Sequence, residues 1–197
     1  AAVPGAMIVM NSHGRGRSAS VLGSTTAELL AATGAPIVVV GPEAGDQPAR
    51  IGGTYVVTLD GSELSESILP TVLDWGRAFG GQPWLVEVLD PTTELPTDVV
   101  PSAGLSARAQ QLQGELGRVV NYEVLRGHRA GPTIIDFAEQ YDASFIFMTT
   151  HGRSGAARLR AGSVAANVVR HAPCPVVMLR PGSLGAPDTS PELPTSG

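Results

Sequence analysis

Short, uninterrupted runs of apolar residues recur along the chain, and a more polar stretch follows each of them. Residues 55–59, 84–89 and 145–148 are examples. Continuous runs of this kind are typical of strands buried on both faces of a parallel sheet, whereas a strand with one face in water alternates apolar and polar residues. Helical sequence separates the runs. Strands that alternate with helices predict βαβ crossovers and a parallel sheet.

From residue 51 onwards, the pattern supplies all the elements of one domain. It predicts strands at 55–59, 84–89, 119–124, 145–148 and 176–179. It predicts helices at 63–79 and 131–141, a helix that ends near residue 117 and a helix that follows residue 163. A turn made of Asp60, Gly61 and Ser62 joins the first strand to the first helix. We therefore expect a doubly wound α/β domain with a parallel five-stranded sheet.

The opening of the chain repeats the end of this domain. When the His-Gly-Arg at residues 13–15 is aligned with the His-Gly-Arg at 151–153, Gly23-Ser24 falls on Gly162-Ser163 after a shift of one residue. Apolar runs flank the loop and the helix in the same order in both copies. This order indicates a duplicated β–loop–α–β unit, with a serine at the N-cap position of each helix.

The repeat predicts the domain organisation. We interpret residues 1–42 as the C-terminal fragment of a first domain and residues 51–181 as a complete domain of the same type. Residues 43–50 have the polar, Gly- and Pro-containing composition of a linker. Residues 182–197 are expected to be a disordered tail.

Composition narrows the class of protein. The 197 residues are 43% hydrophobic and 16% charged, which suits a soluble globular protein, and the net charge of −5 argues against nucleic-acid binding. Cys174 is the only cysteine, so no intrachain disulfide can form and a reducing, cytoplasmic location is expected. No apolar run is long enough to span a membrane, and the first residues lack the basic start of a signal peptide.

The Gly- and Arg-rich loop before Ser163 has the chemistry of an anion site. Glycines let backbone N–H groups approach a ligand, and a helix N-terminus offers unpaired N–H donors and partial positive charge. Arg153, Arg158 and Arg160 add charge. Asp60 follows the first strand and is expected at the same edge, because ligands of open α/β sheets bind at the carboxyl ends of strands. The loop has no P-loop lysine and does not match the dinucleotide fingerprint.

Three stretches together resemble the universal stress protein family: Asp60-Gly61-Ser62 between the first two strands, "HGRSGAARLRAGSV" and the closing "RHAPCPVVMLRP". The resemblance covers residues 51–181, and residues 6–42 as the end of a preceding domain, as in tandem members. It implies a flavodoxin-like, adenine nucleotide alpha hydrolase-like domain that often dimerises and that binds ATP, with or without Mg²⁺, in one branch.

The ATP-binding branch carries a loop with Gly, two residues, Gly, nine residues, Gly and then Ser or Thr. Here the matching residues are Thr149, Gly152, Gly162 and Ser163, so a threonine replaces the first glycine. In the first copy, Asn11, Gly14, Gly23 and Ser24 match with a spacing one residue shorter. The resemblance thus implies a cofactor site made of Asp60, Val88, Thr149, Gly152, Arg153, Gly162 and Ser163, with the backbone near Thr58 and Val88 against adenosine.

Each of these residues also has a purely structural interpretation. The serines can act only as helix caps and the glycines only as turn residues, while Asp60 can either cap the first helix or stabilise its turn through Asx geometry. Thr149 either narrows the pocket or hydrogen-bonds a ribose. His13 and His151 have no identifiable partner for catalysis, and Cys174 is expected to be a small buried residue.

Two main functions stay open. The first is a nucleotide-responsive regulatory module of the stress response, and the second is a nucleotide-free module that works by dimerisation; a slow ATPase is a weaker third, and no enzyme activity is expected. The resemblance implies a homodimer through the closing strands. Because an isolated β–α–β fragment buries too little surface to be stable, we also expect Ile37–Val40 to pair with Val176–Leu179.

Overall fold

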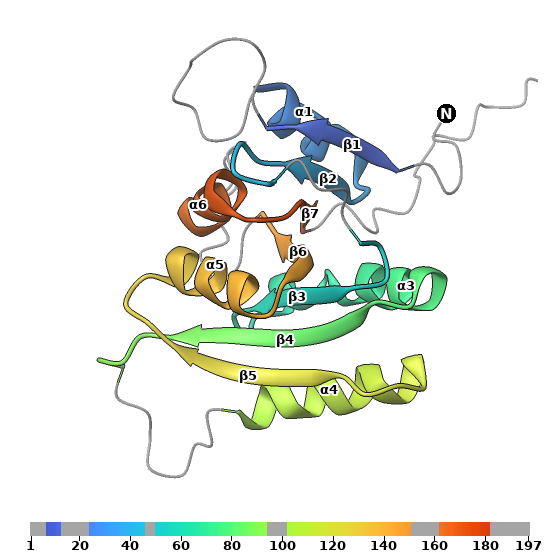
Figure 1. Cartoon of the computed structure of the whole chain (residues 1–197), viewed down its shortest axis with the longest axis vertical. Helices are drawn as coiled ribbons and strands as arrows, with labels where there is room; N and C mark the ends of the chain where they lie inside the picture. The colour runs from blue at the N-terminus through green and yellow to red at the C-terminus, as the bar shows by residue number, and fades with distance from the viewer. Residues whose placement is uncertain (1–6, 13–23, 46–49, 94–101, 151–161, 182–197) are drawn as a thin grey trace, which may run out of the picture.

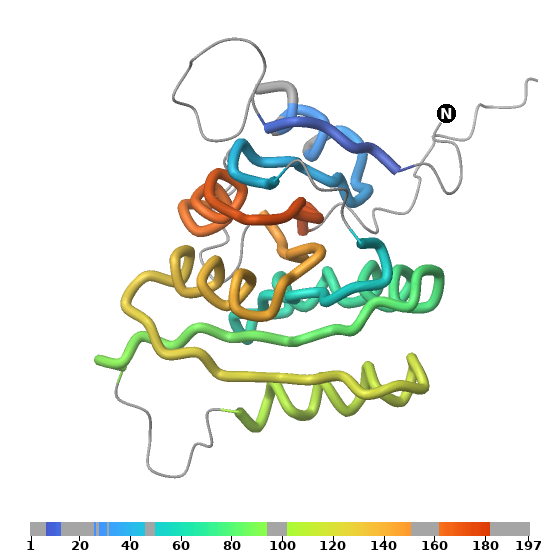
Figure 2. Tube along the Cα trace, in the orientation of Figure 1, coloured from blue at the N-terminus to red at the C-terminus, as the bar shows by residue number. Residues whose placement is uncertain are grey.

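The computed structural model describes residues 7–12, 24–45, 50–93, 102–150 and 162–181. Within these ranges the chain forms one mostly parallel sheet of seven strands, in the order β1-β2-β7-β6-β3-β4-β5 (Figure 1). Figure 2 follows the same trace from the blue N-terminal part to the red C-terminal part. The strands are β1 (Ile8–Asn11), β2 (Ile37–Val40), β3 (Thr54–Leu59), β4 (Gln82–Leu89), β5 (Asn121–Arg126), β6 (Ala143–Thr149) and β7 (Val176–Leu179).

The five strands from β3 to β7 form the expected doubly wound parallel sheet. Numbered along this part of the chain, their spatial order is 3-2-1-4-5. This is the Rossmann-type order, and a flavodoxin sheet has the order 2-1-3-4-5 instead. The strand order reverses between β3 and β6, so a ligand crevice is expected at the carboxyl ends of these two strands.

Helices cover both faces of the sheet. One apolar cluster joins α1 (Ser24–Thr33), α5 (Ala130–Gln140) and α6 (Ser163–His171) to one face, and a second joins α3 (Leu69–Phe79) and α4 (Ala103–Leu116) to the other. The seven residues of β6 are all buried, and its five apolar side chains divide between the two clusters, with Ile146 in the first and Phe147 in the second. This two-sided burial explains the uninterrupted apolar runs in the sequence.

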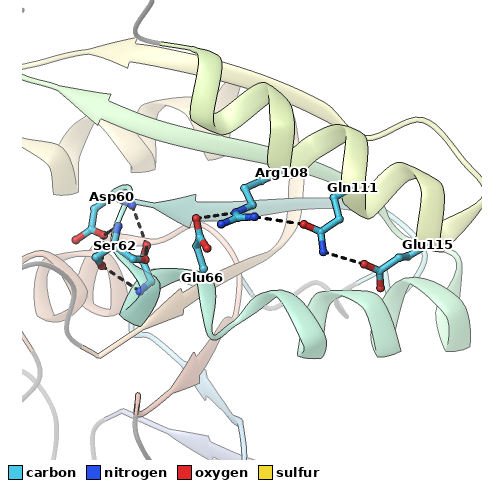
Figure 3. A network of polar contacts seen from close by, with 7 residues as sticks. Asp60, Ser62, Glu66, Arg108, Gln111 and Glu115 are labelled. Atoms are coloured by element: carbon cyan, nitrogen blue, oxygen red, sulfur yellow. Dashed lines mark hydrogen bonds and ion pairs between the residues drawn. The ribbon is translucent and has the colours of Figure 1, made fainter. Parts of the chain in front are cut away.

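The single helix expected at residues 63–79 is two helices. The short α2 (Glu63–Glu66) ends before α3 begins, and Pro70 lies in the first turn of α3. Proline has no N–H to donate and its ring would clash with the carbonyl of Glu66 in a continuous helix, so it is tolerated only near a helix start. The side chain of Glu66, at the end of α2, forms an ion pair with α4: its Oε1 lies 2.8 Å from Arg108 Nε. The polar network continues from Arg108 to Gln111 and Glu115 (Figure 3).

The first unit, β1–α1–β2, extends the same sheet. β2 pairs antiparallel with β7, with Val38 opposite Val177, so the predicted pairing of the closing strands is confirmed. Beyond β2, a β-carbon on Gly41 would lie 2.0 Å from the backbone oxygen of Val169, and His171 Nδ1 lies 2.8 Å from Glu43 Oε1. The unit therefore packs closely against the C-terminal half of α6.

This pairing changes the dimer expectation. β2 lies between β1 and β7, and β7 lies between β2 and β6, so both backbone edges of each closing strand are used within one chain. A homodimer through these same strands has no free edge to use while the chain keeps this arrangement. The interpretation of residues 1–42 as a fragment of a first domain stays a prediction.

Candidate functional site

A cavity of about 330 Å³ lies where the strand order reverses. It is bordered by the ends of β3, β4 and β6 and by the first turns of α5 and α6. Its lining consists of Thr58, Leu59, Asp60, Ser65, Val86, Val88, Ala130, Ile134, Met148, Thr149, Thr150, Gly162, Ser163, Val164 and Ala165. The volume is within the range of small-molecule sites.

Asp60 stands at the end of β3 in a tight turn. Its Oδ1 accepts hydrogen bonds from Ser62 N at 3.0 Å and from Ser62 Oγ at 2.6 Å (Figure 3). Gly61 between them has a φ of 77°, a conformation that glycine adopts without strain. Ser62 is the N-cap of α2 and accepts from Ser65 N. The Asx-turn interpretation of Asp60 is therefore confirmed, and the helix-cap interpretation is wrong, because Ser62 is the N-cap of α2. The same turn places Asp60 in the cavity lining.

The first turn of α6 faces the cavity from the other side. The N-cap is Gly162, whose N–H donates to Thr150 O at 2.8 Å, and no side chain caps this helix in the described residues. The prediction of Ser163 as the N-cap is therefore wrong, because Ser163 is already the first helical residue. An α-helix without a side-chain cap presents backbone N–H donors and partial positive charge, which attract an anion. For Ser24 the structure shows only that α1 begins there.

Thr149 ends β6 and lines the cavity, with 7% of its surface exposed. The next residue, Thr150, donates its N–H to Leu179 O at 2.9 Å and accepts from Gly162 N. The backbone at the end of β6 is thus tied both to β7 and to the start of α6. A side chain at position 149 consequently takes up space that a glycine would leave to a ligand.

Most of the remaining wall is apolar. Val86 and Val88 come from β4, Ile134 from α5 and Met148 from β6. These four side chains could accommodate a flat apolar ring face, because an apolar lining with a few polar groups is the usual make-up of a ligand site.

Five of the seven predicted site residues therefore line one cavity: Asp60, Val88, Thr149, Gly162 and Ser163. Gly152 and Arg153 lie outside the described residues, as do His13, His151, Arg158 and Arg160. The sequence reasoning missed Ser65, which is 3% exposed and whose Oγ donates to Ser62 O and accepts from Asp60 N. It also missed Ala130 and Ile134, because nothing local in α5 indicates that its first turn faces a cavity.

Other candidate groups lie away from the cavity. Cys174 is buried, and burial raises the pKa of its thiol to about 12, so the thiol stays neutral at physiological pH. His128 contacts Asp90 at 3.2 Å. Hydrogen bonds from Thr92, first from its hydroxyl and then from its backbone, lower the pKa of Asp90. Across the described ranges, no group of three or more His, Cys, Asp or Glu residues could hold a metal ion. No helix in those ranges has the length and apolar character needed to cross a membrane.

Comparison with known proteins identifies relatives. A family model described as the universal stress protein family matches residues 54–180, a range that contains every residue of the cavity lining. A universal stress protein of Methanocaldococcus jannaschii is 28% identical over 137 residues, which cover 64% of this chain and 80% of that protein.

Longer relatives also match the first unit. A universal stress protein of Mycolicibacterium smegmatis is 29% identical over 183 residues, which cover 89% of this chain and 62% of that protein. A solved universal stress protein from Archaeoglobus fulgidus has a TM-score of 0.64 at 22% identity, with 89% of this chain and 61% of that chain covered. The chain therefore spans about three fifths of the length of these two proteins.

Proposed function

Because the chain belongs to the universal stress protein family, we propose that it is a regulatory module of the stress response that binds ATP in the cavity between β3, β4 and β6. The observation that carries the proposal is the make-up of this one cavity. It combines a carboxylate, a helix N-terminus that no side chain among the described residues caps, and an apolar wall, and these suit the three parts of a nucleotide.

Each part of ATP has a matching surface in the proposal. The adenine ring lies against the apolar wall that includes Val88 and Met148. The ribose hydroxyls donate to the carboxylate of Asp60, since hydrogen bonds to an ionised acceptor are stronger than neutral ones. The phosphates lie at the N-terminus of α6, beside Gly162 and Ser163, with Gly152 and Arg153 of the preceding loop as further proposed contacts.

Mg²⁺ belongs to the nucleotide in this proposal. Because the described residues offer no cluster of metal ligands, the ion is held mainly by the phosphates, as is usual for Mg²⁺ in nucleotide sites. The module responds to the nucleotide and does not turn it over. Among the described residues, the cavity lining contains no histidine, lysine or cysteine, and its carboxylate, Asp60, accepts two hydrogen bonds from Ser62 within the turn.

Native mass spectrometry of the full chain during titration with ATP and magnesium tests the proposal. The expected result is one bound ATP per chain at millimolar nucleotide or below. When GTP replaces ATP, a bound-nucleotide mass should appear only at a higher nucleotide concentration. No bound nucleotide at millimolar ATP would contradict the proposal. Phosphate release measured in the same samples should stay at the rate of the buffer, and a rate proportional to protein concentration would indicate an ATPase.

A nucleotide-free interaction module is the second candidate. The observation that favours it is Thr149, whose buried side chain takes up cavity space where the ATP-binding pattern has glycine. In that case the cavity stays empty at all nucleotide concentrations, and the function depends on surfaces of the sheet instead.

A further inference from the structure

A second hollow of the surface lies between α3 and α4, and we call it the α3–α4 groove. Its volume is about 460 Å³, which is within the range of ligand sites, and it shares no lining residue with the cavity described above. It is lined by Glu66, Leu69, Pro70, Leu73, Arg108, Gln111, Leu112 and Glu115. The helices α3 and α4 cover the opposite face of the sheet from α5 and α6. The groove is therefore separate from the proposed nucleotide site.

Part of the groove is apolar and only partly covered. Leu112 is 4% exposed and belongs to the apolar cluster that joins α3 and α4 to the sheet. Leu69 and Leu73 are half-buried and pack against that cluster, and Pro70 is exposed. Removing apolar surface from water is favourable, so a partner with apolar side chains gains free energy by covering these residues.

A polar rim runs along α4 beside these side chains. Figure 3 shows Arg108, Gln111 and Glu115 in a row on α4, with Glu66 reaching Arg108 from α2. Arg108 Nη1 donates to Gln111 Oε1 at 3.3 Å, and Gln111 Nε2 donates to Glu115 Oε1 at 3.2 Å. From Arg108 to Glu115 the rim extends over about two helical turns, or about 10 Å. A short helix laid along the groove can therefore contact the whole rim.

The helices that border the groove are acidic. On α2, α3 and α4 the acidic residues are Glu63, Glu66, Asp74 and Glu115, and the basic residues are Arg77 and Arg108. Arg108 is already paired with Glu66, and Arg77 donates to the backbone oxygen of Glu115 at 3.0 Å. The carboxylate of Glu115 accepts from the neutral amide of Gln111, and no ion pair joins it to a cation among the described residues. The groove thus combines apolar surface with excess negative charge.

We propose that the α3–α4 groove binds an amphipathic helix of a partner protein that carries lysine or arginine beside its apolar face. Apolar side chains spaced three and four residues apart lie against Leu69, Leu73 and Leu112, as in other complexes of a helix in a groove. The basic side chains lie beside Glu115 and Asp74, where charge complementarity orients the helix. This binding does not depend on the nucleotide.

The charges of the chain argue against the other occupants. A second copy of the chain cannot supply a basic helix, because no described helix contains more than one lysine or arginine. Residues 182–197 contain Asp188 and Glu192 and neither lysine nor arginine. Nucleic acids and anionic membranes carry the same sign of charge as the groove and are repelled by it. A basic helix from a different protein agrees with both the apolar surface and the charge.

The probe for the test is a fluorescent synthetic peptide of leucine and lysine, spaced so that its helix has one apolar face and one basic face. The control peptide has glutamate in place of every lysine. Both are titrated against the full chain without nucleotide, and we expect saturable binding of the lysine peptide, at least tenfold tighter than that of the glutamate peptide. Amide exchange at residues 69–73 and 108–115 should slow at least threefold in the complex. Absence of saturable binding, equal binding of both peptides, or slowing confined to other helices would overturn the proposal.

Glu115→Lys is the test variant and Glu139→Lys is its matched control. Both residues are exposed and both substitutions change the net charge equally, but Glu139 lies on α5, across the sheet from the groove. Circular dichroism verifies that both variants fold. We expect Glu115→Lys to weaken binding of the lysine peptide at least tenfold and Glu139→Lys to weaken it at most twofold.

Equal weakening by the two variants would show that the peptide responds to net charge alone, and this result would contradict the proposal. Self-association of the chain that Glu115→Lys abolishes would contradict it as well, because a second copy would then be the occupant of the groove.

Discussion

The side-chain oxygen Oδ1 of Asn167 in α6 lies 2.3 Å from the point that a β-carbon on Gly131 in α5 would occupy. This oxygen is buried and has no hydrogen-bond partner in the described residues. The two helices can therefore approach this closely only because residue 131 is a glycine and has no side chain. Both of them also border the cavity, through Ala130 and Ile134 on one side and Ser163 to Ala165 on the other.

Gly131→Ala should destabilise the chain by about 1–3 kcal/mol, the usual cost of forcing a methyl group into a packed contact. Because the added methyl group should push α5 and α6 apart, and both helices border the cavity, the variant should also bind ATP more weakly. Urea unfolding and nucleotide titration of the same variant measure the two effects. Gly114→Ala in α4 is the control, because its β-carbon would meet nothing within 4 Å and alanine favours the helix by about 0.5–1 kcal/mol. Equal stability changes in both variants would contradict the close contact.

Asp60→Asn separates the charge of Asp60 from its role in the turn. Asparagine keeps an oxygen that can accept from Ser62 N and Ser62 Oγ, so the free energy of unfolding should change little. Loss of the charge should weaken ATP binding about tenfold or more, since a hydrogen bond to a charged group contributes about 1.5–3 kcal/mol. Calorimetric titration with ATP gives the binding constant.

The control for that experiment is Ser62→Ala, which removes the N-cap of α2. It should reduce stability by about 1 kcal/mol, as loss of a serine cap usually does. If Asp60→Asn bound ATP as tightly as the unchanged chain, the proposed ribose contact would be wrong.

Thr149→Gly should increase the affinity for ATP, because the Cβ, Oγ1 and Cγ2 atoms leave a cavity wall whose backbone is held in place by Thr150. We expect an increase of about tenfold, or about 1.4 kcal/mol, together with a stability loss of about 0.5–1 kcal/mol for glycine in a strand. The control is Thr54→Gly, at the end of β3 away from the cavity, which should lose stability without any change in ATP affinity. A lower ATP affinity in Thr149→Gly would mean that the hydroxyl binds the nucleotide.

Tyr55 should make the fold sensitive to alkali. Its side chain is fully buried, its hydroxyl donates to Ile51 O, and burial raises its pKa from 10.0 to about 12, with Arg118 acting in the opposite direction. A raised pKa in the folded state means that the unfolded chain loses this proton first. The stability contribution is therefore complete below about pH 10 and is lost as the pH rises towards about 12.

Absorbance of tyrosinate during an alkaline titration tests this. Tyr55 should ionise only as the protein unfolds, and Tyr55→Phe should remove that step. Ionisation of Tyr55 near pH 10.0 in the folded protein would show that its hydroxyl is accessible to water.

Much of the fold followed from local patterns. The apolar runs predicted the strands buried on both faces, such as β2, β6 and β7, to within a few residues, because a strand of this kind must be apolar along its length whatever it pairs with. The Gly-Ser pair marked the start of α6 to within one residue, and the turn residues after β3 marked Asp60. Comparison with the family's motif was enough to choose five residues that line one cavity.

The sequence by itself thus determined the kind of elements, their order and the family, since periodicity and turn chemistry are local properties of the chain. Only the tertiary structure decided what each element meets: that both edges of β2 and of β7 are used within one chain, that α5 contributes Ala130 and Ile134 to the cavity, and that Asn167 faces Gly131. These contacts join residues far apart in the chain. They depend on which surfaces remain uncovered once the sheet has formed, and no local pattern records that.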